Sequence, residues 1–423
     1  MVLAGFALLI IVLLIIGMPV AFTLSLAGIL GIIQFVDMST LSQVPVIAFK
    51  TLNSYVLTSV PLYILMSQIM LTGRVGSGLF DLGSKWMGHL PGGLGIATIF
   101  ACAIFAAISG SSVATAVTIG AMAIPEMLKR GYDRKLVVGS VAAGGTLGIL
   151  IPPSIPMILY GTITDESVGK LFMSGVMPGA LLTLAFVAYI VFASWNKPRE
   201  ARATHAEKMK ALRENIWGLL LPVIIIGGIR IGIFTATEAG AVAILYAAFL
   251  GFIYHEMHIK DMIQGLKETV CTTASIMLIV SAASVFSWIL TKERIPQALT
   301  AWMLANIHSK YVFLIVVNIF LLIVGMFIEG NASMIILVPL LAPIAAQYGI
   351  NEIQFAMIYI FNNAIGALSP PMGTLMFVTC SITKCKTAAF IKEAVPFYIL
   401  LIVNLMLLTW VEPFTTFLVN LFY

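Results

Sequence analysis

The chain is a series of long apolar segments, and two of them are interrupted halfway by a pair of prolines. Ala143 to Gly161 carries Pro152-Pro153 near its centre, and Ala364 to Phe377 carries Pro370-Pro371. Consecutive prolines remove two backbone donors and disfavour helix just before them, so each segment predicts a helix that breaks near the middle of a bilayer. Backbone groups freed at these interruptions, break 1 and break 2, cannot face lipid and need partners from protein, water or a bound ion.

Two further apolar runs are divided by short polar stretches, which predicts two helical hairpins. Tip 1, Ser109-Gly110-Ser111-Ser112, divides the run from Ile96 to Met127, and tip 2, residues 329–333 (EGNAS), divides the run from Tyr311 to Ala346. Each arm of the first run is too short to cross about 30 Å of hydrocarbon at 1.5 Å per residue. A hairpin that enters and leaves on one side is therefore favoured over two crossings.

The remaining apolar runs predict further membrane helices. They cover residues 2–35 with a break at 17–19, and residues 55–71, 179–195, 216–229, 239–254, 269–290 and 397–411. Shorter connecting helices are expected at 172–178 and 387–396. The first run begins without the positively charged region of a cleavable leader, so we expect it to stay in the protein.

The order of hairpin, broken helix, connecting helix and span occurs twice at a constant offset. The proline pairs give 370 − 152 = 218, the glycines of the hairpin exits give 349 − 131 = 218, and Phe390 and Phe172 give 390 − 172 = 218. The first hairpin exit, Lys129 to Lys135, carries four positive charges in seven residues, whereas the second, Gln347 to Glu352, has no Lys or Arg. By the positive-inside rule the first exit is cytoplasmic and the second periplasmic, which predicts inverted repeats.

Composition places the chain in a membrane and excludes several other classes. Of its 423 residues, 60% are hydrophobic and 10% charged, which is typical of a polytopic helical membrane protein. The formal net charge of +5 lies in loops, where it sets orientation and does not recruit nucleic acid. The four cysteines lack metal-ligand spacing, and residues 255–258 (HEMH) do not form a zincin motif and are interpreted as solvated surface. Gly83-Ser84-Lys85 has the wrong order for a phosphate loop, so ATP-driven transport is disfavoured.

Both tips offer uncharged oxygen atoms inside apolar surroundings. A tip that meets a proline break would place carbonyls, hydroxyls and an amide at half-membrane depth, a set that suits a weakly bound monovalent cation such as Na⁺. Small residues are also common where membrane helices pack tightly, and this remains the structural alternative for each tip. Helix N-termini that follow each break carry the positive end of a dipole, which favours a carboxylate ligand.

Three polar positions have two interpretations each. Glu329 is an intramembrane carboxylate that could sit beside an ion or carry a proton, or could accept bonds from the backbone donors of the following helix. Asn362 and Asn363 could serve an ion or an anionic substrate, or could make helix contacts. Glu238 ends a Thr-Ala-Thr-Glu sequence that fits a capping box, so a structural role is favoured there. Arg230 is expected to mark a helix end.

With these broken helices and tips, and with GMPVAFTLSLAG at 17–28 and GIFTATEAGAVA at 232–243, the chain closely resembles the large membrane subunit of TRAP transporters over its whole length. The resemblance implies an all-α, inverted-repeat, elevator-type fold in the bacterial inner membrane. It implies import of an organic anion driven by Na⁺, with C4-dicarboxylates and sialic acid as family substrates; a sialic acid is our specific expectation. It also implies two partners, a soluble periplasmic binding protein and a small four-helix membrane subunit that is absent from this chain.

Site residues follow from the same resemblance. The first Na⁺ site would combine Ser109, Gly110 and Ser111 with Gly145, Gly148 and Pro152. The second would combine Glu329, Gly330 and Asn331 with Asn363, Gly366 and Pro370. The substrate would lie near Ser112, Thr115, Thr146, Ser154, Asn362 and Thr374.

The expected division of the chain separates a scaffold from transport elements. Residues 1–90 are N-terminal scaffold helices, 91–178 the first transport elements, 179–310 scaffold helices with a basic cytoplasmic loop at 196–214, 311–396 the second transport elements, and 397–423 a C-terminal helix. An ion channel would need a continuous polar pore, which the apolar arms beside each tip oppose. An intramembrane enzyme is also opposed, because Ser109 and Ser111 have no nearby membrane His or Lys to activate them.

Overall fold

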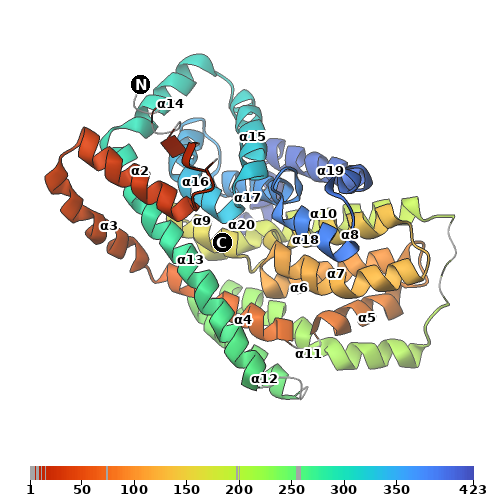
Figure 1. Ribbon diagram of the computed structural model, residues 1–423. Coiled ribbons are helices and arrows are strands. Elements are labelled where there is room, and N and C mark those ends of the chain that lie inside the picture. Colours follow the sequence, from red (N-terminus) through yellow and green to blue (C-terminus); the bar gives the residue numbers. More distant parts are fainter. Residues whose placement is uncertain are drawn as a thin grey trace.

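The computed structural model describes residues 5, 9–10, 12–14, 16–72, 75–196, 199, 201–253 and 259–423. Its described residues form helices connected by short loops, with no β-strand among them (Figure 1). Six of these helices are long and apolar enough to cross a membrane, or seven if one bent pair is counted as a span. The prediction of an all-α polytopic membrane protein is confirmed at this level. The segment 255–258, interpreted above as solvated surface, lies outside the described residues.

The N-terminal helices pack around one long helix, α13 (Ile259–Lys292, 34 residues), which crosses the molecule diagonally in Figure 1. The predicted break at residues 17–19 is present, because Gly17 has φ +88° and α2 begins after Pro19. The next predicted helix is preceded by one that the sequence did not predict, α3, and the two segments meet at 64°. The elements here are α2 (Val20–Phe35), η1 (Met38–Ser42), α3 (Gln43–Leu52), η2 (Val56–Thr58) and α4 (Ser59–Thr72).

A first set of elements contains hairpin 1 and the first broken helix. After α5 (Val75–Met87) come α6 (Gly93–Ser109), α7 (Ser112–Lys129), α8 (Arg134–Thr146), η3 (Leu147–Ile149), α9 (Ile155–Thr164) and α10 (Val168–Ala193). Helices α6 and α7 pack against each other, and break 1 separates η3 from α9.

A second set has the same order. It consists of α15 (Lys310–Phe327), α16 (Gly330–Gln347), α17 (Glu352–Leu368), α18 (Thr374–Thr383) and α19 (Thr387–Trp410). The bounds of α16 and α7 differ by 330 − 112 = 218 and 347 − 129 = 218, the offset of the proline pairs. Helices α15 and α16 are each 18 residues long and apolar enough to cross a membrane, so their length alone does not require a hairpin that re-enters.

Both arms of hairpin 1 and the second arm of hairpin 2 are longer than predicted, because tip residues at their ends belong to helices. Ser111 is the N-cap of α7, and its side chain accepts a hydrogen bond from Ala114 N. Glu329 is the N-cap of α16 and accepts one from Ala332 N. Polar tip residues therefore start a helix as well as interrupting the apolar run.

The predicted connecting helices at 172–178 and 387–396 are wrong as separate elements. Each is the first part of one continuous helix, α10 or α19, with Pro178 or Pro396 inside it. Proline removes one backbone donor, but its fixed φ is helical, and membrane helices tolerate it when neighbours satisfy the freed group. The expected domain boundaries after 178 and 396 thus fall within continuous helices.

The two sets pack across each other. Helix α7 packs on α18, and α16 packs on α9. Arg134 at the first hairpin exit donates through Nη2 to the carbonyl of Thr383, 3.1 Å away, at the end of the second broken helix. Glu352 at the second exit lines a cavity together with Thr164, at the end of the first broken helix. The two hairpin exits therefore lie at opposite ends of the first broken helix.

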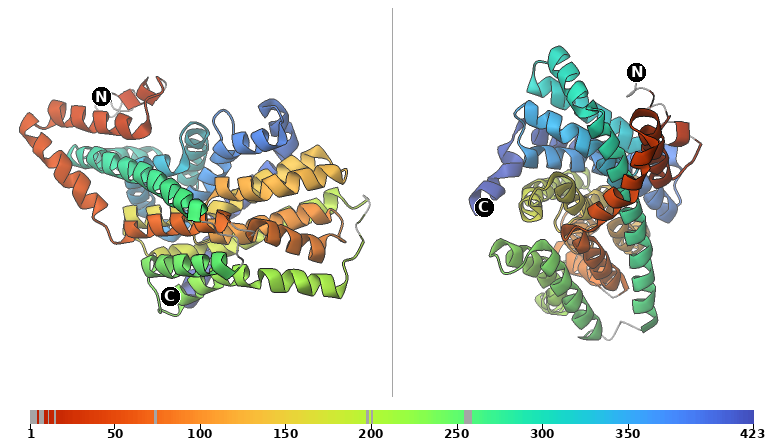
Figure 2. Two further views of the ribbon diagram at one scale, coloured as in Figure 1. Left: turned by 60° about the horizontal axis from the view of Figure 1, so that its bottom comes forward. Right: turned by 90° about the vertical axis from the view of Figure 1, so that its left-hand side faces the viewer.

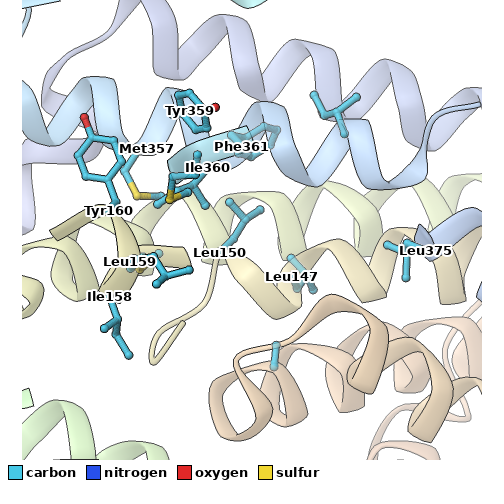
Figure 3. Close-up of a cluster of buried hydrophobic side chains, with 14 of the residues drawn as sticks. Leu147, Leu150, Ile158, Leu159, Tyr160, Met357, Tyr359, Ile360, Phe361 and Leu375 are labelled. Atoms are coloured by element: carbon cyan, nitrogen blue, oxygen red, sulfur yellow. The ribbon is translucent and has the colours of Figure 1, made fainter. Parts of the chain in front are cut away.

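The broken helices also pack on each other through a core of large apolar side chains. Leu147, Leu150 and Leu159 belong to one cluster with Met357 and Phe361 of α17 (Figure 3), and all five are fully buried or nearly so. In water, burial of such side chains would be the main attraction between the two halves. In a membrane, close van der Waals packing holds the helices together instead. Both breaks are thereby held in one body.

The remaining helices surround this body (Figure 2). They are α11 (His205–Arg230), α12 (Ala236–Ile253), α14 (Ile295–Asn306), which was not predicted, and α20 (Pro413–Phe422). The predicted capping box is confirmed: Thr235 N donates to Glu238 Oε2 at 2.8 Å, and Glu238 N donates to Thr235 Oγ1 at 3.2 Å. Arg230 ends α11 as predicted, with its guanidinium 3.7 Å from the centre of the Phe422 ring.

Candidate functional site

Tip 1 lies directly against break 1. Gly110, with φ +61°, is so close that an added Cβ would be 2.7 Å from the carbonyl oxygen of Pro153. An added Cβ at Gly148 would overlap the carbonyl group of Ser111. Such backbone-to-backbone approach needs glycine, because any side chain would separate the two segments. The first six residues predicted for Na⁺ binding therefore come from two segments in contact, with Pro152 inside the break.

The hydroxyl groups of tip 1 converge on one carbonyl. Thr115 Oγ1 donates to the carbonyl oxygen of Ser111 at 2.8 Å, and Ser109 Oγ lies 3.0 Å from Thr115 Oγ1. Ser109, Ser112 and Thr115 are all buried. This side of the site thus presents two hydroxyls and a carbonyl within hydrogen-bonding distance of one another.

Tip 2 meets α17 just before break 2. Asn363 Nδ2 donates to the carbonyl oxygen of Gly330 at 3.0 Å, and Ser333 Oγ donates to Asn363 Oδ1 at 3.3 Å. Tyr359 OH in turn donates to Ser333 Oγ at 3.3 Å. One residue beyond the second proline pair, Met372 N donates to the carbonyl oxygen of Met326 at 3.1 Å, which ties break 2 to the end of α15.

Glu329 makes the contacts of a helix cap. Its Oε2 accepts from Ala332 N at 3.0 Å, and its Oε1 accepts from Asn331 Nδ2 at 2.9 Å. These bonds favour the second interpretation given above, acceptance of backbone donors at the start of α16. The Asn331 Oδ1 atom is buried and has no partner among the described residues. Tip 2 therefore holds one unused amide oxygen.

Of the six residues predicted near the substrate, the structure places Ser112, Thr115, Thr146 and Ser154 around tip 1 and break 1. Ser112 and Thr115 begin α7, and Thr146 ends α8, where its Oγ1 donates to the carbonyl of Ala143 at 2.6 Å. An added Cβ at Gly145 would lie 3.0 Å from Ala116 Cβ and 2.8 Å from Leu375 Cδ1. This contact also brings the start of α18, where Thr374 is exposed, to the same region.

Ser154 and Asn362, two of the six predicted substrate residues, use their side chains locally. Ser154 Oγ donates to the carbonyl of Ile149 at 2.8 Å across break 1. Asn362 Nδ2 donates to Asn318 Oδ1 at 2.7 Å, so its amide group points to α15 and makes a helix contact. Its Oδ1 atom is buried and has no partner among the described residues.

A polar network behind tip 2 was not predicted. Asn318 Nδ2 donates to Thr409 Oγ1 at 2.9 Å, and Gln354 Nε2 donates to the carbonyl of Leu408 at 2.9 Å. These bonds join α15, α17 and α19. The available signal was a single amide, Asn318, within the apolar sequence KYVFLIVVNIFLLIVGMF, which is expected to face other helices.

This arrangement can be compared with known proteins. A family model for the DctM component of the tripartite ATP-independent periplasmic transporters matches residues 7–414. A C4-dicarboxylate TRAP transporter large permease protein of Pseudomonas aeruginosa is 41% identical over 92% of both chains. The sialic acid TRAP transporter permease protein of Haemophilus influenzae is 34% identical over 96% of this chain, which covers 66% of that longer protein.

A solved structure shares the fold at low sequence identity. The YdaH transporter of Alcanivorax borkumensis superposes with a TM-score of 0.63 over 89% of this chain and 90% of its own, at 14% identity. The family match covers almost the whole chain and agrees with the resemblance seen in the sequence motifs. This chain belongs to the family of tripartite ATP-independent periplasmic (TRAP) transporters and corresponds to their DctM component, the large permease subunit.

Proposed function

We propose that this chain imports an organic acid anion together with Na⁺ by an elevator movement, after a periplasmic binding protein has delivered the anion. The observation that carries the proposal is the pairing of each hairpin tip with its own proline-broken helix. Gly110 and Gly148 bring tip 1 against break 1, and Gly330 and Asn363 bring tip 2 against the helix that precedes break 2. Two such pairs in one body are typical of a secondary transporter's ion and substrate site.

The donor atoms at both tips fit Na⁺. Tip 1 offers the Ser111 carbonyl and the Ser109 and Thr115 hydroxyls, and tip 2 offers the Gly330 carbonyl and the unpartnered Oδ1 of Asn331. Hard monovalent cations prefer such oxygen ligands, and a low formal charge keeps binding weak enough for release. In this proposal Na⁺ draws each tip onto its break and offsets the charge of the anion.

The packing of the two element sets supports the elevator movement. Hairpins and broken helices form one body, in which α7 packs on α18 and α16 on α9. The long helix α13 and its neighbours α2, α3 and α4 form the proposed scaffold beside it. The two hairpin exits at opposite ends of the first broken helix agree with an inverted repeat, which gives a site that can open to either side.

The N-termini of α9 and α18 favour an anionic substrate. Both begin directly after a break, at Ile155 and Thr374, so their free backbone donors and positive dipole ends lie beside the tips. The two relatives described above are named for a C4-dicarboxylate and for sialic acid. We propose a dicarboxylate or a sialic acid as cargo, and a small membrane subunit as partner, in keeping with the longer Haemophilus influenzae relative.

Uptake by proteoliposomes tests the proposal. They would contain this chain, its small subunit and the binding protein loaded with labelled succinate or sialic acid, with an inward Na⁺ gradient or with K⁺ in its place. Accumulation is expected only with the Na⁺ gradient and the loaded binding protein. Equal accumulation without the gradient would reject the coupling.

A pair of substitutions tests the site assignment in the same assay. Ser109→Leu and Asn331→Leu each remove an oxygen from one tip and should abolish Na⁺-driven uptake. Ser275→Leu on α13 is the matched control, because the Ser275 side chain is exposed and bonds only its own helix, donating to the carbonyl of Cys271. Full uptake by both tip variants would show that the tips do not hold Na⁺.

A further inference from the structure

A cavity of about 360 Å³ lies between α13 and the helices α9, α16 and α17, and its lining includes no residue of either tip. Ser287 and Thr291 of α13 form one side. Tyr160 and Thr164 of α9 and the C-terminal half of α16 form the other, and Glu352 at the start of α17 lies at an exposed edge. Its volume is in the range of small-molecule sites. Its walls therefore come from both the proposed scaffold and the proposed moving body.

Two threonine hydroxyls and one carboxylate give this cavity hydrogen-bond acceptors, beside the hydroxyls of Ser287 and Tyr160. Thr164 Oγ1 donates its hydrogen to the carbonyl of Tyr160 at 2.9 Å, and Thr291 Oγ1 donates to the carbonyl of Ser287 at 2.9 Å. Each hydroxyl donates its hydrogen to a carbonyl of its own helix, so only its lone pairs are available to a ligand. Glu352 is the single charged residue in the lining and adds a carboxylate. The two threonine oxygens and the Glu352 carboxylate therefore suit a positively charged ligand that donates several hydrogen bonds.

Tyr160 supplies a second, independent observation. It is 1% exposed, lines the cavity, and its hydroxyl has no hydrogen-bond partner among the described residues. The other two fully buried tyrosines are bonded: Tyr63 OH donates to the carbonyl of Ala236 at 3.0 Å and Tyr359 OH to Ser333 Oγ at 3.3 Å. The Tyr160 hydroxyl therefore opens into the cavity, where it can bond an occupant. Figure 3 shows Tyr160 reaching from α9 towards the blue helices.

We propose that this cavity binds an amphiphile with a primary ammonium head. The ammonium group would donate to Glu352 and to the Thr164 and Thr291 hydroxyls, and the apolar body would pack on the alanines and prolines of α16, with Tyr160 beside it. Such a ligand satisfies both halves of the lining, because three N–H donors meet acceptors and an alkyl or aryl body meets apolar carbon.

The ligand would inhibit transport, and this inference rests on the proposed elevator function. It touches α13 on one side and α9 and α16 on the other, so it binds only while these helices keep their present separation. A ligand that binds one of two conformations shifts the population towards it by its difference in affinity. Occupation would therefore hold the moving body in this position.

Binding is tested first, without transport, on the full chain and its small subunit in phosphatidylglycerol nanodiscs. The probe is radiolabelled 4-phenylbutylammonium, with 4-phenylbutanol and 4-phenylbutanoate as competitors of the same size. The ammonium compound should bind saturably, and the alcohol and the carboxylate should compete at least tenfold more weakly. Equal competition by all three compounds would overturn the proposal.

Two substitutions locate the probe. Glu352→Gln should weaken its binding at least tenfold, and Ala342→Phe should prevent binding by filling the cavity. Glu412→Gln, an exposed carboxylate at the N-terminus of α20, is the matched control and should bind as the unmodified chain does. Unchanged binding by Glu352→Gln would overturn the assignment even if Ala342→Phe failed to fold.

The source and the effect of the ligand need two further measurements. Adding phosphatidylethanolamine to the nanodiscs should raise the apparent Kd of the probe if a lipid headgroup supplies the ammonium, and leave it unchanged if the natural ligand is a soluble amine. In uptake assays the probe should slow the unmodified chain and spare Glu352→Gln. Binding of the probe without slower uptake would overturn the proposed inhibition. Failure of Na⁺ coupling would leave the binding result intact.

Discussion

At the residue scale, two glycines hold tip 1 against break 1, and one carboxylate caps the helix that begins at tip 2. Gly110 and Gly148 let two backbones touch where tip 1 meets break 1, and the sequence predicted both as site residues without showing that contact. Glu329, in contrast, had two interpretations, and the structure supplies the hydrogen bonds of one of them. Substitution of Gly148 is therefore expected to impair Na⁺ binding, whereas substitution of Glu329 by glutamine is expected to be tolerated.

Gly148→Ala is expected to separate tip 1 from break 1, because the new Cβ would overlap the Ser111 carbonyl. Overpacking of this kind costs about 1–3 kcal/mol. If that cost falls on the Na⁺-bound arrangement of tip 1, the apparent Na⁺ affinity in uptake would fall by about 5- to 140-fold. Gly227→Ala is the control, since an added Cβ there meets nothing within 4 Å. An unchanged Na⁺ dependence for Gly148→Ala would show that the contact is not needed.

Glu329→Gln is expected to keep most of the uptake, because a glutamine oxygen can still accept from Ala332 N. Glu329→Leu removes the cap and should lower the free energy of unfolding by about 0.5–2 kcal/mol. Uptake at several pH values and thermal unfolding would measure both. Complete loss of uptake in Glu329→Gln, with normal stability, would instead show that the carboxylate itself serves transport, beside the ion or as a proton carrier.

At the element scale, helix α17 is fixed by its crossing with α15. An added Cβ at Gly366 would lie 2.7 Å from Gly325 Cα, so the two backbones touch near break 2. One turn before Gly366 on α17, Asn362 donates to Asn318 of α15. Small residues and single amides at helix crossings are the usual means of association in a membrane, where the hydrophobic effect does not drive helices together.

Gly366→Ala is expected to push α17 from α15 and to lower the unfolding temperature, again through overpacking by about 1–3 kcal/mol. The control is Gly218→Ala, whose Cβ would make an ordinary contact of 3.6 Å with Val75. A normal unfolding temperature together with lost Na⁺ binding would assign Gly366 to the ion site alone.

A double-mutant cycle measures the neighbouring amide pair. Combining Asn318→Ala with Asn362→Ala should give a coupling of about 0.6 kcal/mol, the usual size for hydrogen bonds between membrane helices. Each single variant should leave the apparent KM for the substrate unchanged if Asn362 serves helix contact. A raised KM in Asn362→Ala alone would restore its predicted role beside the substrate.

At the scale of the whole molecule, two sets of helices meet, along α13 and along α4, which packs on α6 and α9. Hairpins and broken helices pack on one another, whereas α13 packs on α2, α3 and α4 and touches α16 at the shared cavity. If the first body moves against the second, a covalent bridge between them must stop transport, and a bridge within one body must not.

Cross-linking tests this division. In a chain whose four cysteines are changed to alanine, Ser287→Cys with Ala342→Cys places thiols on α13 and α16 across one cavity. A short bismaleimide should abolish uptake by this variant. The control, Thr164→Cys with Ala346→Cys, joins α9 to α16 within one body and should retain uptake. Retained uptake in both cross-linked variants would contradict a rigid-body movement at this interface.

Features that follow from local rules could be predicted from the amino-acid sequence. Proline pairs break helices wherever they stand, so Pro152-Pro153 and Pro370-Pro371 marked both breaks, and apolar length marked most membrane helices. The capping box at Thr235 and Glu238 was predictable because it joins residues only three positions apart. The predicted helix ends at Pro178 and Pro396 were wrong, because both prolines lie inside continuous helices. A single proline weakens a helix locally, and whether neighbouring helices compensate cannot be seen in the sequence.

Which segments meet could be seen only in the folded chain. Contacts between Gly148 and Ser111, or between Asn362 and Asn318, depend on the packing of elements that lie 37 and 44 positions apart along the chain (148 − 111 and 362 − 318). No local rule sets such pairings, because small residues and single amides suit many helix crossings equally well. The cavity beside Tyr160 arises for the same reason: it is the space left between α13 and three helices from other parts of the chain.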